Sequence, residues 1–319
     1  MNISDDSANV LHRIKFYLLL TLHIPSILLY LLIFIFLATH RPQLTALINR
    51  GPIILLLINF LVAACILPLT IHFYRSNRVL PASAAYCTFW TFLQYTLNVS
   101  SEILMVIISV QRHIFILNRN LLRIRVKRIL FHDIPLFFGV AYPAILYFGL
   151  VVIYPCDGTQ WNFSALVCGY ANCYLLDSNA FAIFDWAMHT GIPIVIIILA
   201  NVMLIIRIIR QKRRLQQRVT WRKQRRMTIQ LLSVAALYFI GWMPITSIAV
   251  IQQIHQSQLA AEIQSKYIVD FIYLVCLFMP LVCIGILPEL KKWIQGLFRL
   301  HKRRRNTVKP THVTNNTAR

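Results

Sequence analysis

Hydrophobic residues are gathered into seven long runs, separated by shorter polar segments. The runs cover residues 16–39, 52–73, 89–117, 129–153, 181–206, 227–251 and 267–287. Each run has at least the ~20 residues with which an α-helix crosses the hydrocarbon core of a bilayer. The pattern predicts an all-α membrane protein, a bundle of seven transmembrane helices between residues 16 and 287.

The two ends of the chain lie outside this bundle. Residues 1–15 precede the first run, and residues 300–319 form a basic tail. The first run is too long for the apolar region of a signal peptide, and "ATHRPQL" after it lacks a small-residue cleavage site. We therefore expect the first run to be retained as a membrane anchor.

Charge is distributed as unevenly as hydrophobicity. The chain has a formal net charge of +22, although only 13% of its residues are charged. Most Lys and Arg residues follow the first, third, fifth and seventh runs, and "RIIRQKRRLQQRVTWRKQRR" contains no acid. Because basic loops mark the cytoplasmic side, we expect a multi-pass plasma-membrane protein with an extracellular N-terminus and a cytoplasmic C-terminus.

The same charge raises the alternative of nucleic-acid binding. The basic segments lack the interleaved aromatic residues and the motif frame of known nucleic-acid readers. Basic residues that flank membrane spans more often contact anionic lipid headgroups. We therefore expect membrane lipids, and no nucleic acid, among the partners.

Four of the seven cysteines fall on the side expected to be extracellular. Cys87 begins the third run, and Cys156, Cys168 and Cys173 lie in the loop before the fifth. An even number of cysteines in an oxidising compartment predicts two disulfides. Three connectivities are open, and we favour Cys87–Cys168 with Cys156–Cys173.

Glycosylation sequons follow the same topology. Asn2 and Asn162 lie on the expected outer side, so both are predicted glycosylation sites. Asn98 would lie within the bilayer and Asn315 in the cytoplasm, so we expect neither to be modified.

A set of landmark residues occurs in order across the runs, and its members are Pro68, Cys87, Arg112, Pro193, Trp242, Pro244 and Pro280. In this set and its spacing the chain resembles rhodopsin-like (class A) G-protein-coupled receptors. "QRH" stands where that family has Asp/Glu-Arg-Tyr, "GWMP" resembles its Cys-Trp-x-Pro, and residues 288–299 resemble its amphipathic inner helix. The general texture also resembles divergent invertebrate receptors without a known ligand.

The resemblance implies a receptor that binds an extracellular ligand and activates a heterotrimeric G protein. In that role Arg112 meets the G protein and is held at rest by two acids, but this chain has Gln111 and Gln224 there. A neutral hydrogen bond is roughly half as strong as a charge-assisted one. We therefore expect a loosely held resting state with measurable basal activity. The alternative is an Arg112 that only snorkels to lipid headgroups.

Other switch positions also depart from the family pattern. Asn59 replaces the sodium-binding aspartate and Met279 its polar partner, so we expect no sodium site, metal or cofactor. Asn201 and Cys283 replace the two activation tyrosines. Glu102 lies near mid-span, where a charged carboxylate costs several kcal/mol. It is either a neutral acid bonded to a side chain such as Asn59 or Asn98, or a proton- or ligand-linked switch element.

Polar and aromatic residues in the outer halves of the spans predict a ligand pocket, formed by Gln94, Asn98, Asp185, His189, Trp242, Asp270 and Tyr273. Gln94 replaces the family's amine-binding aspartate, which argues against a monoamine, and no mid-membrane lysine is present for retinal. Two acids beneath a long loop favour a cationic ligand, such as a peptide. The alternative for both acids is solvation at a helix end.

A transporter or channel not coupled to G proteins is the rival from another class. The odd number of spans and the absence of an evident inverted repeat or pore loop argue against it. An enzyme is not expected, because the sequence shows no nucleophile–base or metal-ligand spacing. Arrestin is a further expected partner if the tail is phosphorylated at Thr307, Thr311, Thr314 or Thr317.

Overall fold

The computed structural model describes residues 3–117, 124–156, 158–170, 172–177, 179–214, 218–255, 258–286, 290 and 293. All regular structure in these residues is helical, and seven helical segments are long and apolar enough to span a membrane. The seven predicted spans are therefore confirmed. Of the expected amphipathic helix at 288–299, only Leu290 and Trp293 are described, and the basic tail lies outside the described residues.

Three spans are single α-helices: α1 (Ile3–Thr39), α5 (Ala84–Leu117) and α11 (Arg218–His255). The other four are composite. Span two is α3 (Leu47–Leu61), η1 (Val62–Ile66) and α4 (Leu67–Ser76); span four is α6 (Arg125–Arg128), η3 (Ile129–Asp133), α7 (Ile134–Tyr147) and η4 (Phe148–Ile153); span five is α9 (Asn179–Trp186), η6 (Ala187–Gly191) and α10 (Ile192–Arg214); span seven is η7 (Gln264–Ile268), η8 (Val269–Phe271) and α13 (Ile272–Ile286). The connections contain α2 (Arg41–Thr45), η5 (Leu166–Tyr170), α8 (Cys173–Asp177) and α12 (Gln258–Ile263).

Prolines account for several of these breaks. The π-helical turns η1, η3 and η6 each end two residues before a proline, namely Pro68, Pro135 and Pro193. A proline has no N–H, and its ring collides with the carbonyl four residues earlier. Widening the preceding turn relieves that collision, so the spans continue across the bilayer with a local bulge.

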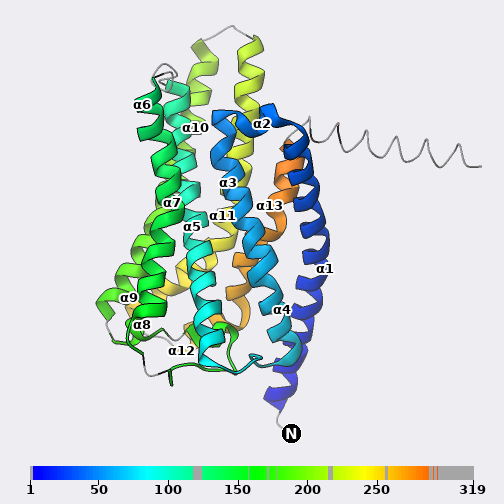
Figure 1. Cartoon of the computed structure of the whole chain (residues 1–319), viewed down its shortest axis with the longest axis vertical. Helices are drawn as coiled ribbons and strands as arrows, with labels where there is room; N and C mark the ends of the chain where they lie inside the picture. The colour runs from blue at the N-terminus through cyan, green and yellow to red at the C-terminus, as the bar shows by residue number, and fades with distance from the viewer. Residues whose placement is uncertain are drawn as a thin grey trace, which may run out of the picture.

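Helix α5 lies at the centre of the bundle and packs against α3, α7, α10 and α11 (Figure 1). The outward faces are apolar, as a lipid-facing surface requires; Phe137 and Ile145 on α7 are both 74% exposed. The N-terminal end of α1 lies at the same end of the bundle as α8, α9 and α12, and α2 lies at the opposite end (Figure 1). These are called the outer and inner ends below.

Helix α1 extends well beyond the predicted first span. It begins at Ile3, and its membrane-compatible stretch begins at Asn9 rather than at residue 16. The sequence pattern missed these turns because Asp5, Asp6 and Arg13 interrupt the apolar run. The extension carries Lys15 to the outer ends of spans two and seven.

Spans six and seven approach each other most closely at Gly241. A Cβ built on Gly241 would lie 2.7 Å from Cγ2 of Val275 and 3.2 Å from the carbonyl oxygen of Phe271. Only a residue without a side chain allows α11 to pack this closely against the backbone before α13. This contact positions Trp242, the next residue, inside the bundle, where it is 8% exposed.

Candidate functional site within the helix bundle

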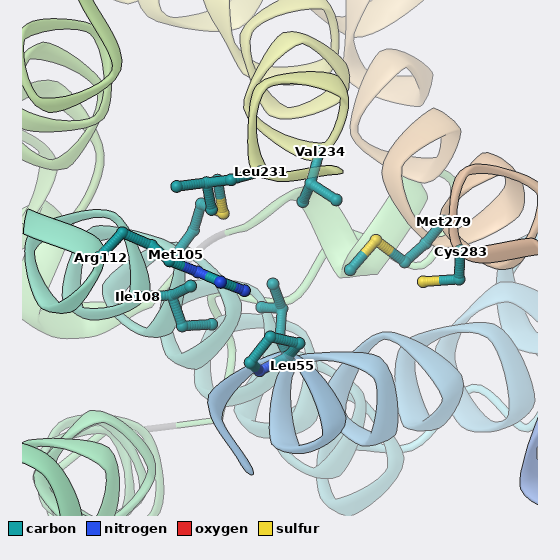
Figure 2. A pocket seen from close by; sticks show the side chains of 9 residues that line it. Leu55, Met105, Ile108, Arg112, Leu231, Val234, Met279 and Cys283 are labelled. Atoms are coloured by element: carbon teal, nitrogen blue, oxygen red, sulfur yellow. The ribbon is translucent and has the colours of Figure 1, made fainter. Parts of the chain in front are cut away.

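Arg112 lies near the inner end of α5 and is 6% exposed. Its guanidinium reaches from α5 toward Leu55 of α3, with residues of α11 and α13 around it (Figure 2). It enters a cavity of 20 Å³, which has room for about one water molecule. The other residues that line this cavity are Pro52, Leu55, Met105, Ile108, Leu231, Val234, Met279 and Cys283. Within the described residues, the Arg112 side chain forms no hydrogen bond or ion pair.

Gln111 points toward span four instead of toward Arg112. Its Nε2 donates to the carbonyl oxygens of Phe131 (3.2 Å) and His132 (3.1 Å), and its Oε1 lies 3.0 Å from Nδ1 of His132. A glutamate could not donate to the two carbonyls, because an ionised carboxylate only accepts hydrogen bonds. The substitution at this position therefore replaces a partner for arginine with a tie between spans three and four.

Two further contacts join the inner part of α5 to α10. Nε2 of His113 lies 2.8 Å from the carbonyl oxygen of Ala200. Asn201 Nδ2 donates to Ile197 O at 2.7 Å and to Ser109 Oγ at 3.4 Å. Asn201 thus reaches the helix that carries Arg112, one turn before it.

The remaining switch positions lie on spans six and seven. Pro244 lies inside α11 and Pro280 inside α13, so each removes a backbone hydrogen bond from a long helix. Met279 and Cys283 both face the Arg112 cavity. Gln224 belongs to α11, but its side chain lies outside the described residues.

Tyr238 of α11 is a functional candidate that sequence reasoning missed. Its hydroxyl accepts a hydrogen bond from Asn59 Nδ2 at 3.0 Å and lies close to Ser101. Asn59 Nδ2 also donates to Leu55 O at 2.9 Å, and Ser101 Oγ donates to Asn98 O at 2.9 Å. The bond between Asn59 and Tyr238 joins spans two and six, and Ser101 of span three lies beside it. The available signal was a tyrosine one turn before Trp242 in an apolar run, because a buried phenol needs a polar partner.

Glu102 is fully buried, and neither carboxyl oxygen has a hydrogen-bond partner within the described residues. The expected bond to Asn59 or Asn98 is therefore not formed. Glu102 lines a cavity of 10 Å³ between spans three, five and six, together with Tyr238 and Trp242. The other residues that line this cavity are all apolar, namely Ile194, Ile197, Ile198 and Phe239.

In the outer half, Gln94 and Tyr273 lie in contact between spans three and seven. The Tyr273 hydroxyl is 2.8 Å from Thr70 Oγ1 of span two. Gln94 is 3% exposed, and its Oε1 has no partner within the described residues. This polar group beneath the second outer loop includes two of the residues predicted for the ligand pocket.

Asp185 and His189 form a second outer cluster, between spans four and five. Asp185 Oδ1 lies 2.7 Å from His189 Nδ1 and accepts from the Tyr147 hydroxyl at 2.7 Å. Oδ2 accepts from the Tyr174 hydroxyl at 3.0 Å, and His189 Nε2 lies 2.9 Å from the Tyr142 hydroxyl. Each side chain of this cluster is thus hydrogen-bonded to another member, and Asp185 and His189 are both buried.

Asp270 forms a third outer cluster with Lys15 and Tyr74. Its Oδ2 lies 2.7 Å from Lys15 Nζ, and the Tyr74 hydroxyl donates to the carboxylate at 2.7 Å. The ammonium also lies 5.0 Å from the centre of the Tyr74 ring, which is cation–π distance. Asp270 is therefore already neutralised by a cation from α1. Its bonds to Lys15 and Tyr74 hold spans one, two and seven together.

The second outer loop is attached to the bundle by covalent bonds. The structure pairs Cys87 with Cys168 and Cys156 with Cys173, the connectivity favoured among the three possible ones. Cys173 begins α8, so the second disulfide also fixes Tyr174 beside Asp185.

Residues 167–170 of this loop have φ between 48° and 81°, in the left-handed region. For the β-branched Val167 this conformation is strained, and its full burial holds it in place. The segment turns Tyr170 inward, so that its hydroxyl is buried near Tyr273 and Asp270. The loop therefore lies over the polar group that contains Gln94 and Tyr273.

The two predicted glycosylation sites differ in what the structure describes. Asn162 is exposed, and its Oδ1 accepts a hydrogen bond from the Ser164 N–H at 3.0 Å. Asn2 and Asn315 lie outside the described residues, and Asn98 is buried in α5.

The expected pocket residues therefore divide into separate groups. Gln94, Tyr273 and Asp270 lie near one another, Asp185 and His189 belong to the interface of spans four and five, and Trp242 lines the same cavity as Glu102. Over the part of the chain that the structure describes, no group of three or more His, Cys, Asp or Glu side chains could hold a metal ion.

Comparison with known protein families supports the assignment that these landmarks suggest. The model of the family described as "7 transmembrane receptor (rhodopsin family)" matches residues 30–283, from mid α1 to the end of α13. No curated protein matches the chain significantly. The match covers all seven spans in part or whole and contains Arg112, Trp242 and Pro280. The chain therefore belongs to the rhodopsin family of seven-transmembrane receptors, which are not enzymes and signal through G proteins.

Proposed function

We propose that this receptor is loosely held in its resting state and activates its G protein measurably without ligand. The observation that carries the proposal is the Arg112 guanidinium, which lies in an apolar cavity without an acid beside it among the described residues. The neighbouring Gln111 is engaged by His132 and Phe131 instead. Nothing in the described part of the chain therefore neutralises the arginine at rest.

The physical argument concerns desolvation. A buried charge without a partner is unfavourable by several kcal/mol, because it loses hydration and gains no ion pair. A state in which span six moves aside and Arg112 meets water or polar groups of a G protein removes that penalty. The balance between the two states therefore shifts toward the active one.

The test measures ligand-free nucleotide exchange on a panel of G proteins for the wild type and for Arg112→Ala. We expect exchange on at least one G protein and its loss in the variant at equal surface expression. Arg125→Ala is the matched control, because Arg125 is an exposed basic residue of α6 at the same inner end. Exchange that survives in Arg112→Ala would overturn the proposal.

For the ligand, we propose a cationic molecule such as a peptide, with Asp270 as its counter-ion. Support comes from the groups around that carboxylate: with the aromatic face of Tyr74, whose hydroxyl donates to it, the carboxylate already holds a cation, the Lys15 ammonium. Asp185 is the weaker candidate, since a histidine and two tyrosines occupy its oxygens. Gln94, Asn98, Tyr273 and Trp242 remain proposed pocket residues.

A panel of basic peptides tests this ligand class. Asp270→Asn should weaken the activation of the receptor by an active peptide about tenfold or more, because it removes a charge-assisted contact. Lys15→Met should strengthen activation, because it removes the competing internal cation. Equal potency in both variants would exclude Asp270 as the counter-ion.

We also propose that the N-terminus is extracellular, that Asn2 and Asn162 are glycosylated, and that arrestin binds the phosphorylated tail. The Cys156–Cys173 disulfide includes the first residue of α8, which lies at the same end of the bundle as the start of α1 (Figure 1), and this supports the orientation. The placement among divergent invertebrate receptors is part of the same proposal and rests on sequence texture alone. Antibody access to an N-terminal tag on intact cells tests the orientation.

A further inference from the structure

Two arginines without a partner lie beside the Asp270 cluster, where span two ends next to the start of α1 (Figure 1). Arg75 belongs to the last turn of α4 and Arg78 follows the helix, one and four residues after Tyr74, whose hydroxyl donates to Asp270. Both are exposed, and neither side chain forms a hydrogen bond or ion pair within the described residues. The helix dipole favours a cation in the last turn, but Arg78 lies beyond the helix end.

The turn that carries Arg78 is attached to α1. Asn77 ends α4 with a φ of 54°, a left-handed conformation that asparagine tolerates. Its Oδ1 lies 2.7 Å from Nδ1 of His12, and its Nδ2 donates to Oδ1 of Asn9 at 3.0 Å. The N-terminal extension of α1 therefore holds this turn from one side.

The same turn is also attached to the second outer loop. Ser76 Oγ donates to the carbonyl oxygen of Arg78 at 2.7 Å, and the N–H of Val79 donates to the carbonyl oxygen of Phe163 at 2.8 Å. Val79 is 1% exposed. The backbone is thus fixed on both sides while the arginine side chains stay exposed. A fixed backbone lowers the ordering cost when such side chains bind a ligand.

The charge around this turn does not suit a purely cationic ligand. Asp270 is already paired with Lys15, so Arg75 and Arg78 add two positive charges that no described acid compensates. Like charges repel, and salt screens this repulsion incompletely at short range. A ligand whose positive group reaches Asp270 is therefore favoured if it also carries a negative group that meets the arginines.

We propose that Arg75 and Arg78 form an anion-binding subsite, and that the ligand carries a carboxylate in addition to the cationic group bound by Asp270. A guanidinium presents a planar set of donors that matches the two oxygens of a carboxylate. The ligand is then bipolar, such as a peptide with a basic residue at one end and acidic residues at the other. This inference rests on the ligand class proposed above.

Direct binding tests the subsite without requiring activation of the receptor. The probe is a dye-labelled peptide with an arginine at one end and two aspartates at the other, and its counterpart has asparagines in place of the aspartates. Fluorescence anisotropy measures the binding of each to the purified full-length receptor in phosphatidylcholine nanodiscs. We expect the acidic probe to bind the wild type about tenfold more tightly, because its carboxylates form charge-assisted bonds.

Three variants locate this preference. The double variant Arg75→Gln/Arg78→Gln should abolish it, because glutamine keeps a polar side chain but not the charge. Arg13→Gln is the matched control and should retain the preference, since Arg13 is exposed at the same outer end but lies one turn before the outward-facing Tyr17 of α1. Asp270→Asn should weaken the binding of both probes and leave their ratio unchanged.

The outcomes separate the subsite from the ligand class. Equal binding of the two probes to the wild type, or no binding of either, would overturn the subsite; lipid phosphates that already occupy both arginines would give equal binding. An equal loss of preference in Arg13→Gln would also overturn it, because general electrostatic attraction would then be sufficient. If Asp270→Asn leaves both affinities unchanged, the counter-ion role of Asp270 fails, while a preference that depends on Arg75 and Arg78 supports the subsite.

Discussion

The outer and inner halves of this bundle treat their buried charged groups in opposite ways. In the outer half, Asp185 and Asp270 each bind a basic residue and at least one tyrosine hydroxyl, and two disulfides hold the loop above them. Toward the inner half, Glu102 and Arg112 are buried without a partner among the described residues. Both halves belong to the same helices, so the contrast lies in the side chains and not in the fold.

This contrast separates stability from switching. Satisfied networks favour one arrangement, because each broken bond leaves a buried polar group unpaired. Unsatisfied groups destabilise the arrangement in which they occur and so lower the free-energy difference from the alternative state. We infer that the outer half holds the receptor together, while the inner half is poised between two conformations.

The largest expected effect is on the outer half. Asp185→Ala leaves His189 and the hydroxyls of Tyr147 and Tyr174 without their acceptor, and breaking such a buried pair costs about 3–5 kcal/mol. We expect a marked fall in surface expression and in the melting temperature of the purified protein. Asp177→Ala is the control, because Asp177 bonds Tyr154 at an exposed site. Equal loss in both variants would show that the Asp185 network has no special role.

The two disulfides should contribute unequally to stability. They close loops with sequence separations of 81 and 17 residues. Loop-closure entropy predicts a loss of about 4.5 kcal/mol on removing Cys87–Cys168 and about 3 kcal/mol on removing Cys156–Cys173. Thermal unfolding of the paired Cys→Ser variants measures the difference. The reverse order would mean that the Cys156–Cys173 bond acts mainly by holding Tyr174 against Asp185.

Span number followed from the sequence because runs of about 20 apolar residues have few other uses. The side-chain partners did not, since hydrogen bonds depend on how helices are rotated against one another. Asn59 was singled out from its position relative to Pro68, but its bond to Tyr238 depends on the rotation of span six. Lys15 was assigned to the segment before the first span because the N-terminal extension of α1 is not strongly apolar. The pairing of Gln111 with the start of span four likewise has no sequence signal.

A moderate effect is expected where the inner half is satisfied. Gln111→Leu removes its bonds to Phe131 and His132 and leaves two carbonyl oxygens without that donor, which costs about 1–3 kcal/mol. The melting temperature should fall, while Arg112-dependent coupling should persist because Gln111 does not hold Arg112. Loss of coupling at full expression would show that Gln111 acts directly on the switch.

The smallest effect on stability is expected at the partly exposed edge of the outer half. Lys15 and Asp270 have side-chain exposures of 12% and 15%, so solvent screens part of their attraction. Lys15→Met keeps the apolar stem of the side chain and leaves Asp270 its bonds from the Tyr74 hydroxyl, so it should lower stability by only about 1 kcal/mol. Thermal unfolding at low and high salt measures this contribution, and a loss much larger than that of Asp185→Ala would reverse the proposed ranking.

The most direct test of the central claim is ligand-free nucleotide exchange by Gln111→Glu beside the wild type. A glutamate cannot donate to the carbonyls of Phe131 and His132, and its carboxylate can form the ion pair that Arg112 lacks. The account predicts lower basal exchange by about tenfold at equal surface expression, because a charge-assisted bond of 1.5 kcal/mol or more would then stabilise the resting state. Unchanged or higher basal exchange would contradict the claim that an unpaired Arg112 leaves the inner half poised to switch.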